Sequence, residues 1–181
     1  MIDYIPLSAA AAKRQTTAEL RSLAAERMTR LGYPIVASEF APVGSGCRFD
    51  VIGLSRYTRQ VRIYEVKSSR ADYLADSKWE KYLPFCTHFA FVAPAGVIAK
   101  WEIDRDIGLI EYGHPKFEQM LANRRFGFTL HRDDMLRSTR PSRRLRASVE
   151  DAQWIALLES LAFSGRACMD ADHMLTDGAG I

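Results

Sequence analysis

Residues 61–67 read Val-Arg-Ile-Tyr-Glu-Val-Lys, a β-branched strand pattern that carries a glutamate and a lysine near its end. Side chains alternate between the two faces of a strand, so Glu65 and Lys67 are expected to point to the same side. Asp50 lies in the preceding apolar segment, Arg-Phe-Asp-Val-Ile at 48–52. Two carboxylates can hold a hard cation such as Mg²⁺, and a neighbouring ammonium can orient or deprotonate a water molecule. The pattern therefore predicts a divalent-metal site that cuts phosphodiester bonds.

The positive charge of the chain is concentrated in one segment. The 181 residues carry a net charge of +3, and 48% hydrophobic with 26% charged residues is the composition of an ordinary soluble globular protein. Between 124 and 146, eight arginines stand against Asp133 and Asp134, a local balance of +6. The segment is either a solvated, loose stretch or a patch that contacts phosphates. The eight are Arg124, Arg125, Arg132, Arg137, Arg140, Arg143, Arg144 and Arg146.

Cysteine usage and hydropathy bear on the compartment. Cys47, Cys86 and Cys168 show neither C-x-x-C nor Cys/His metal spacing, so we expect no zinc site and no disulfide, in a reducing compartment. No run of about 18 apolar residues predicts a membrane span. Residues 1–12 lack the basic cluster and the apolar core of a signal peptide. The cytoplasm is the expected location.

Periodicity predicts helices that alternate with strands. Thr16-x-x-Glu19 has the form of a capping box and opens a helix that Gly32 ends. A second helix begins after Ser69 and must end at Pro84. Because a helix is the usual crossover between parallel strands, the strands on either side of it are expected to pair in parallel. The expected strands are 33–40, 47–54, 61–67, 87–93 and 107–112.

The second half of the chain gives weaker signals. We expect a short helix over 117–123 and a short strand over 126–130. Pro141 and the arginines predict a loose segment over 138–147, and 149–163 reads as an amphipathic helix. The tail after 165 is expected to fray.

The order of these motifs resembles a known group of enzymes. Asp50 followed by Glu65-Val66-Lys67, on consecutive strands after a leading helix, resembles the PD-(D/E)XK nuclease superfamily. The longer block 63–94, which includes Asp76-x-Lys78-Trp79-x-x-Tyr82, is similar to the MmcB-like DNA-repair family and to related phage-encoded proteins. The resemblance extends over roughly 16–113.

This resemblance implies an α/β fold with a restriction-endonuclease-like core. Such a core is a central mixed β-sheet of about four to five strands flanked by helices, here with a helical C-terminal extension. We expect an N-terminal extension over 1–14, the nuclease-like domain over 15–135, a basic linker and C-terminal helix over 136–165, and a flexible tail over 166–181.

The resemblance also implies roles for individual residues. Asp50 and Glu65 would be ligands of Mg²⁺ or Mn²⁺, together with the backbone carbonyl of Val66, and Lys67 would be the catalytic lysine. The superfamily often adds another acidic ligand, and the candidates here are Glu39, Glu19 and Glu26. Glu19 is equally explained as part of the capping box, and Glu26 as a solvated helix residue.

DNA is the expected partner, and no membrane is expected. Phosphate contacts are assigned to Lys78, Arg140, Arg143, Arg144 and Arg146. Trp79 and Tyr82 are read as core residues more readily than as base-stacking platforms. The expected function is a metal-dependent DNA endonuclease or repair nuclease, acting alone or as a homodimer. The alternative is a weak or inactive nucleic-acid-binding accessory protein for DNA repair or for a phage.

Overall fold

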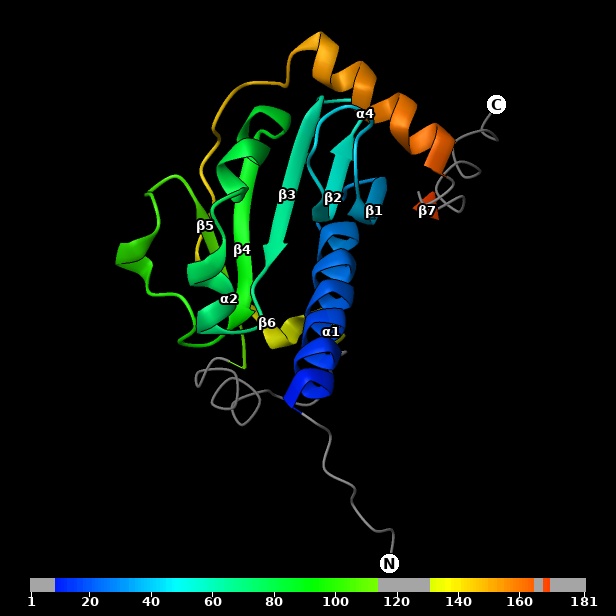
Figure 1. Ribbon diagram of the computed structural model, residues 1–181. Helices are drawn as coiled ribbons and strands as arrows, with labels where there is room; N and C mark the ends of the chain where they lie inside the picture. The colour runs from blue at the N-terminus through cyan, green and yellow to red at the C-terminus, as the bar shows by residue number, and fades with distance from the viewer. Residues whose placement is uncertain (1–8, 114–130, 165–167, 170–181) are drawn as a thin grey trace, which may run out of the picture.

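The structure is a computed structural model that describes residues 9–113, 131–164 and 168–169 (Figure 1). The helix expected over 117–123, the strand expected over 126–130 and most of the tail lie outside the described residues. In chain order the elements are α1 (Ala9–Arg30), β1 (Ile35–Phe40), β2 (Phe49–Ser55), β3 (Gln60–Val66), α2 (Arg70–Ala75), η1 (Trp79–Phe85), β4 (His88–Pro94), η2 (Lys100–Glu102), β5 (Gly108–Tyr112), η3 (Arg132–Met135), β6 (Leu136–Arg140), α4 (Asp151–Ser164) and β7 (Cys168–Met169).

The strands form one mixed sheet in the order β6-β5-β4-β3-β2-β1-β7. Strands β1, β2 and β3 pair antiparallel, as a meander requires, and β3-β4-β5 pair in parallel. Strands β6 and β7 close the two edges in antiparallel pairings. The α/β class, the mixed sheet and the C-terminal helix are confirmed. The expected count of four to five strands is too low, since the described residues alone form seven.

Helices cover the sheet on both faces, and the alternation of β3 side chains assigns each residue to one of them. Tyr64 belongs to the apolar cluster formed with Leu23 and Met28 of α1. Ile63 points the other way, into the cluster completed by Trp154 of α4 and by η1. Figure 1 shows α4 at the far end of the strands from most of α1. One apolar layer on each face of the sheet therefore fixes which side chains reach the same surface.

Helix α1 is longer than expected. It begins at Ala9, so the Thr16 capping box does not start it. Alanine has the strongest intrinsic helix propensity, and the run of alanines over 9–12 carries the helix past the expected start. Part of the expected N-terminal extension is thus helical.

The single helix expected between Ser69 and Pro84 is wrong. Ser69 does cap α2 through its hydroxyl, which accepts from the backbone N–H of Asp72. Helix α2 then ends at Ala75 because Asp76 turns away to bind Lys67, and the 3₁₀ helix η1 follows with Pro84 inside it. Tertiary contacts of one aspartate override the helical periodicity.

The segment expected to be loose is also ordered along most of its length. Its first residues form the end of β6, which pairs with β5. Beyond the strand, the Arg143 N–H donates to the Asp106 carbonyl at 3.0 Å and the Leu145 N–H to the Thr87 carbonyl at 2.8 Å. These bonds hold the basic segment against the sheet. Among the described residues, no helix is long and apolar enough to cross a membrane.

Candidate active site

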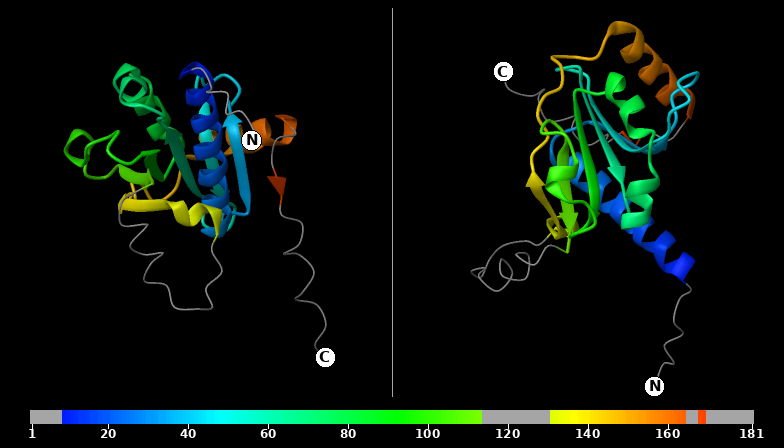
Figure 2. Two further views of the ribbon diagram at one scale, coloured as in Figure 1. Left: turned by 90° about the horizontal axis from the view of Figure 1, so that it is seen from below. Right: turned by 60° about the vertical axis from the view of Figure 1, so that its left-hand side comes forward.

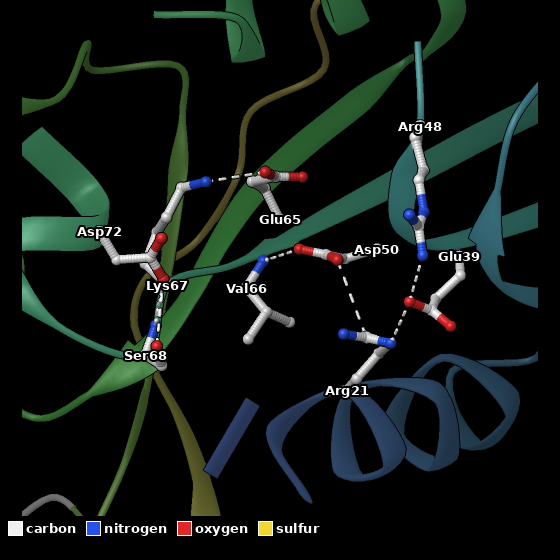
Figure 3. A network of polar contacts seen from close by, with 9 residues as sticks. All are labelled: Arg21, Glu39, Arg48, Asp50, Glu65, Val66, Lys67, Ser68 and Asp72. Atoms are coloured by element: carbon white, nitrogen blue, oxygen red, sulfur yellow. Dashed lines mark hydrogen bonds and ion pairs between the residues drawn. The ribbon is translucent and has the colours of Figure 1, made fainter. Parts of the chain in front are cut away.

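The carboxylates predicted as metal ligands lie in a row across three strands. Val51 of β2 pairs with Tyr64 of β3, so Asp50, one step earlier, lies opposite Glu65. The pairing of β1 with β2 likewise brings Glu39 opposite Asp50. Residues directly opposite each other in an antiparallel pair share a face of the sheet. Figure 3 shows Asp50 between Glu65 and Glu39.

Glu65 is a buried carboxylate with a hydrogen-bond partner on only one of its two oxygens. The residue is 7% exposed, and its Oε1 accepts from Lys67 Nζ at 2.7 Å. Its Oε2 is buried without a hydrogen-bond partner among the described residues. Burial, and next the charge of Asp50, raise the pKa of Glu65 to about 7. One carboxylate oxygen is therefore available to a ligand.

Asp50 is the more accessible of the two carboxylates. Its Oδ2 accepts from the Val66 N–H at 2.9 Å, and its Oδ1 lies 3.7 Å from Arg21 Nε. Burial raises the pKa of Asp50, although the Val66 N–H and Arg21 counteract that rise. The N–H and C=O of a strand residue point to the same edge, so the Val66 carbonyl also faces Asp50.

Lys67 is held between two carboxylates. Its Nζ lies 2.7 Å from Glu65 Oε1 and 2.6 Å from Asp76 Oδ2, and the residue is 5% exposed. Burial by itself lowers the pKa of a lysine, but the two carboxylates outweigh it and the pKa of Lys67 is raised. Lys67 is therefore protonated, which suits it to donate hydrogen bonds and not to act as a base.

Asp76 lies near the site without having been predicted as a site residue, and Tyr82, predicted as a core residue, is buried beside it. Asp76 binds Lys67, and its other oxygen, Oδ1, accepts from the Lys78 N–H at 2.7 Å. Tyr82 is buried, and burial followed by the charges of Glu65 and Asp76 raises its pKa to about 12. The available signal was Asp76 itself, an acidic residue in the block that resembles the MmcB-like family.

The three further acidic candidates have other partners. Glu39 adopts a positive φ of 53° and binds Arg21 at 2.7 Å as well as Arg48. Glu19 accepts from the Tyr112 hydroxyl at 3.4 Å, and Glu26 binds Arg132 at 2.6 Å. Of the three, only Glu39 lies beside Asp50. Within the described part of the chain, no group of three or more His, Cys, Asp or Glu side chains is arranged to hold a metal ion.

The residues present nevertheless fit a hard divalent cation. Asp50, the unpaired oxygen of Glu65 and the Val66 carbonyl are oxygen donors, the type that Mg²⁺ prefers. Mg²⁺ commonly keeps several waters and takes one or two protein carboxylates plus substrate phosphates. Two carboxylates are therefore enough protein ligands for Mg²⁺ at this site.

The predicted DNA contacts differ in their distance from this site. Lys78 is exposed and only two residues from Asp76. The basic segment is linked to Thr87, whose N–H donates to the Val61 carbonyl at 2.7 Å. Val61 and Glu65 are four residue steps apart, roughly 13 Å along β3. The guanidinium groups also have protein partners: Arg140 donates to the carbonyls of Ile103 and Asp104, Arg143 pairs with Asp106, Arg144 donates to Ala147 and Arg146 to Pro84.

Comparison with known proteins agrees with this architecture. A protein of unknown function from Silicibacter pomeroyi has a solved structure that matches with a TM-score of 0.57 at 22% identity, covering 89% of this chain and 88% of that one. At this identity the match concerns the fold alone. Comparison with curated proteins gave no match. The family model described as DNA repair protein MmcB-like matches residues 6–160. This chain belongs to the MmcB-like family of DNA repair proteins.

Proposed function

We propose that this protein is a metal-dependent deoxyribonuclease that acts in DNA repair. The observation that carries the proposal is Glu65 Oε2, a buried carboxylate oxygen without a hydrogen-bond partner in the described part of the chain. Leaving such an oxygen unpaired is costly. A divalent cation shared with Asp50 on the neighbouring strand would remove this cost and would satisfy both carboxylates.

Each residue of the site has a distinct role in this proposal. Asp50, Glu65 and the Val66 carbonyl hold the cation, which when bound neutralises the scissile phosphate and lowers the pKa of a water ligand. Lys67, kept protonated, orients the attacking water and stabilises negative charge on the phosphate. Water forms the new P–O bond, one bridging P–O bond breaks, and the leaving oxygen takes up a proton. Asp76 holds Lys67 in place.

Phosphate contacts away from the reacting bond fall to cationic side chains, of which Lys78, Arg143 and Arg144 are exposed and Arg140 and Arg146 partly buried. Lys78 is two residues from Asp76, while the arginines over 140–146 lie farther from the reacting bond and would meet neighbouring phosphates of the bound DNA. Such contacts are independent of base sequence. A homodimer stays a prediction.

One observation favours a second candidate, a DNA-binding accessory protein that does not cut. The charges of the site are largely balanced without a cation, because Lys67 stands between Glu65 and Asp76 and Arg21 lies near Asp50. A cluster of side chains whose charges balance one another can serve the stability of the fold in a protein that does not bind a metal ion. The two candidates differ in whether the carboxylates are needed for metal-dependent cutting.

The test is a cleavage assay on single-stranded, duplex, flapped and branched DNA with Mg²⁺, Mn²⁺ or EDTA. The nuclease proposal expects cutting only with metal, and at least a 100-fold loss in the Asp50→Asn/Glu65→Gln double variant. Glu80→Gln, at an exposed carboxylate, is the matched control. If folded wild-type protein binds these DNAs without cutting any of them, the accessory role replaces the nuclease.

A further inference from the structure

A cavity of about 190 Å³ lies on the α1 face of the sheet, between the last turns of α1, the start of β3 and β6. Arg27 and Arg62 line it, with Ser138, Arg140 and Ser142 beside them. The guanidinium of Arg140 is engaged elsewhere, since it donates to the carbonyls of Ile103 and Asp104. Figure 2 shows η3 and β6 next to the end of α1. Two elements distant in sequence, α1 and β3, thus bring the guanidinium groups of Arg27 and Arg62 to one small space.

Neither Arg27 nor Arg62 forms an ion pair with a carboxylate in the described part of the chain. Arg62 donates to neutral oxygens, among them the Tyr33 hydroxyl at 3.1 Å and the Ser142 hydroxyl at 3.0 Å. Arg27 donates to the Leu136 carbonyl at 3.3 Å, while its Nε is buried without a hydrogen-bond partner. Arg30 lies about one turn after Arg27 on α1. Unlike Arg27, it forms ion pairs, with Asp133 and Asp134.

The positive charge next to the cavity contributes to a lowered pKa of a neighbouring side chain, His88. His88 pairs with Arg62 across the parallel β3-β4 ladder, so both side chains share a face. Burial, and then the charges of Arg62 and Arg144, lower the pKa of His88 to about 4. The carbonyl end of α1 supplies only about half an elementary negative charge, which leaves most of the charge of the two guanidinium groups uncompensated.

From this geometry we infer that the cavity is a binding site for a phosphate group. Guanidinium groups offer paired N–H donors that match the oxygens of a phosphate, and the serine hydroxyls can add further bonds. The volume equals roughly six water molecules at about 30 Å³ each, enough for a tetrahedral oxyanion and part of its carrier. The phosphate is either free in solution or the 5′-phosphate of a nucleotide.

This site is separate from the candidate nuclease site. Tyr64 lines the cavity, whereas the side chain of its neighbour Glu65 points to the opposite face of the sheet. The phosphate bound here is therefore not the one placed at the Asp50–Glu65 pair. The inference holds whether or not the protein cuts DNA.

Calorimetric titration of the full chain with inorganic phosphate, deoxyadenosine 5′-monophosphate and unphosphorylated deoxyadenosine, at constant ionic strength set with chloride, tests the inference. We expect binding of a phosphate-bearing probe and none of the nucleoside. Arg62→Gln should weaken that binding at least tenfold, and Arg56→Gln, an exposed arginine in the β2-β3 turn, should leave it unchanged. Tighter binding of the monophosphate than of phosphate identifies a nucleotide as the ligand, and equal binding identifies free phosphate.

A second variant guards against a failure of Arg62→Gln to fold. Arg27→Gln removes the unpaired Nε and should also weaken binding at least tenfold, with the melting temperature in chloride measured as the folding control. Phosphate at one hundred times Kd should raise the melting temperature of the wild type by roughly 5 °C. Binding that is unchanged in both variants, or no binding of either phosphate-bearing probe by the wild type, overturns the inference.

Discussion

Lys67 Nζ lies 2.6 Å from Asp76 Oδ2, at the point where α2 ends and the chain turns toward η1. The contact joins the end of a central strand to the connection that follows it. It also gives the lysine a second carboxylate besides Glu65, so its charge is held in a fixed place. This contact explains why α2 is short, and after Glu65 it is the second carboxylate that raises the pKa of Lys67.

Replacing Asp76 should impair cleavage more than metal binding. In Asp76→Asn, Lys67 loses a charged partner and its orientation, and the single-turnover cleavage rate should fall by about 10- to 100-fold. The affinity for Mn²⁺, measured by titration without DNA, should change less than about threefold because Asp50 and Glu65 remain. Glu80→Gln serves as the control. A loss of Mn²⁺ affinity as large as that of Glu65→Gln would place Asp76 among the ligands.

Arg21 should compete with the metal for its ligands. It lies near both Asp50 and Glu39, so Arg21→Gln removes a positive charge from the site. At the interaction energy of about 1 kcal/mol expected for a partly exposed pair, Mn²⁺ affinity should rise roughly fivefold. Arg48→Gln, which affects Glu39 alone, should change the affinity by less than about twofold. Weaker Mn²⁺ binding in Arg21→Gln would mean that Arg21 instead holds Asp50 in position.

The basic segment should contribute to the salt dependence of DNA binding. Each neutralised phosphate adds about −0.9 to the slope of log affinity against log salt on duplex DNA. Replacing the four arginines by glutamine together should flatten this slope by roughly two to four units and leave Mn²⁺ affinity unchanged. Fluorescence-anisotropy titrations at several salt concentrations measure it. An unaltered slope would mean that these side chains contact only their protein partners and not the phosphates of DNA. The four are Arg140, Arg143, Arg144 and Arg146.

His88 should make the fold sensitive to acid. Its pKa is about 4 in the native state against an ordinary value of 6.5. As pH falls from 6.5 toward 4, His88 becomes protonated in the unfolded chain but stays neutral in the native state. The free energy of unfolding therefore decreases. His88→Gln should reduce this loss by about 1 kcal/mol, after allowance for the partial exposure of the ring. Urea unfolding of both proteins at pH 7.5, 5.5 and 4.5 gives the comparison. If the free energy of unfolding falls equally with pH in the wild type and in His88→Gln, the prediction is wrong.

Gly108 should be intolerant of any side chain. A Cβ there would lie 2.8 Å from the Ala90 Cβ and 2.9 Å from the Ser142 backbone nitrogen. Backbone cannot move as cheaply as a flexible side chain, so Gly108→Ala should lower the free energy of unfolding by about 1 to 3 kcal/mol. Ser148→Ala, at an exposed position, is the control in chemical denaturation. Wild-type stability in Gly108→Ala would show that the segment after β6 is not held against the sheet.

Local sequence determined the parts of the site that depend on strand periodicity. Glu65 and Lys67 share a face because side chains alternate along any strand, and Asp50 joins them because a short turn makes β2 and β3 neighbours. The parallel pairing of β3 with β4 followed in the same way from the connection between them. These relationships span few residues, so their signals are present in the sequence itself.

The tertiary structure decided the features that join distant segments. Asp76 leaves the helical pattern because it pairs with Lys67, and the arginine-rich stretch becomes ordered because β5 and Thr87 offer it backbone partners. Local propensity is weak, and a few contacts across the fold outweigh it. The sequence by itself thus determined which chemistry the central strands carry. Only long-range packing decided which side chains hold Lys67 and which arginines meet around a cavity, because those partners come from segments that no local pattern connects.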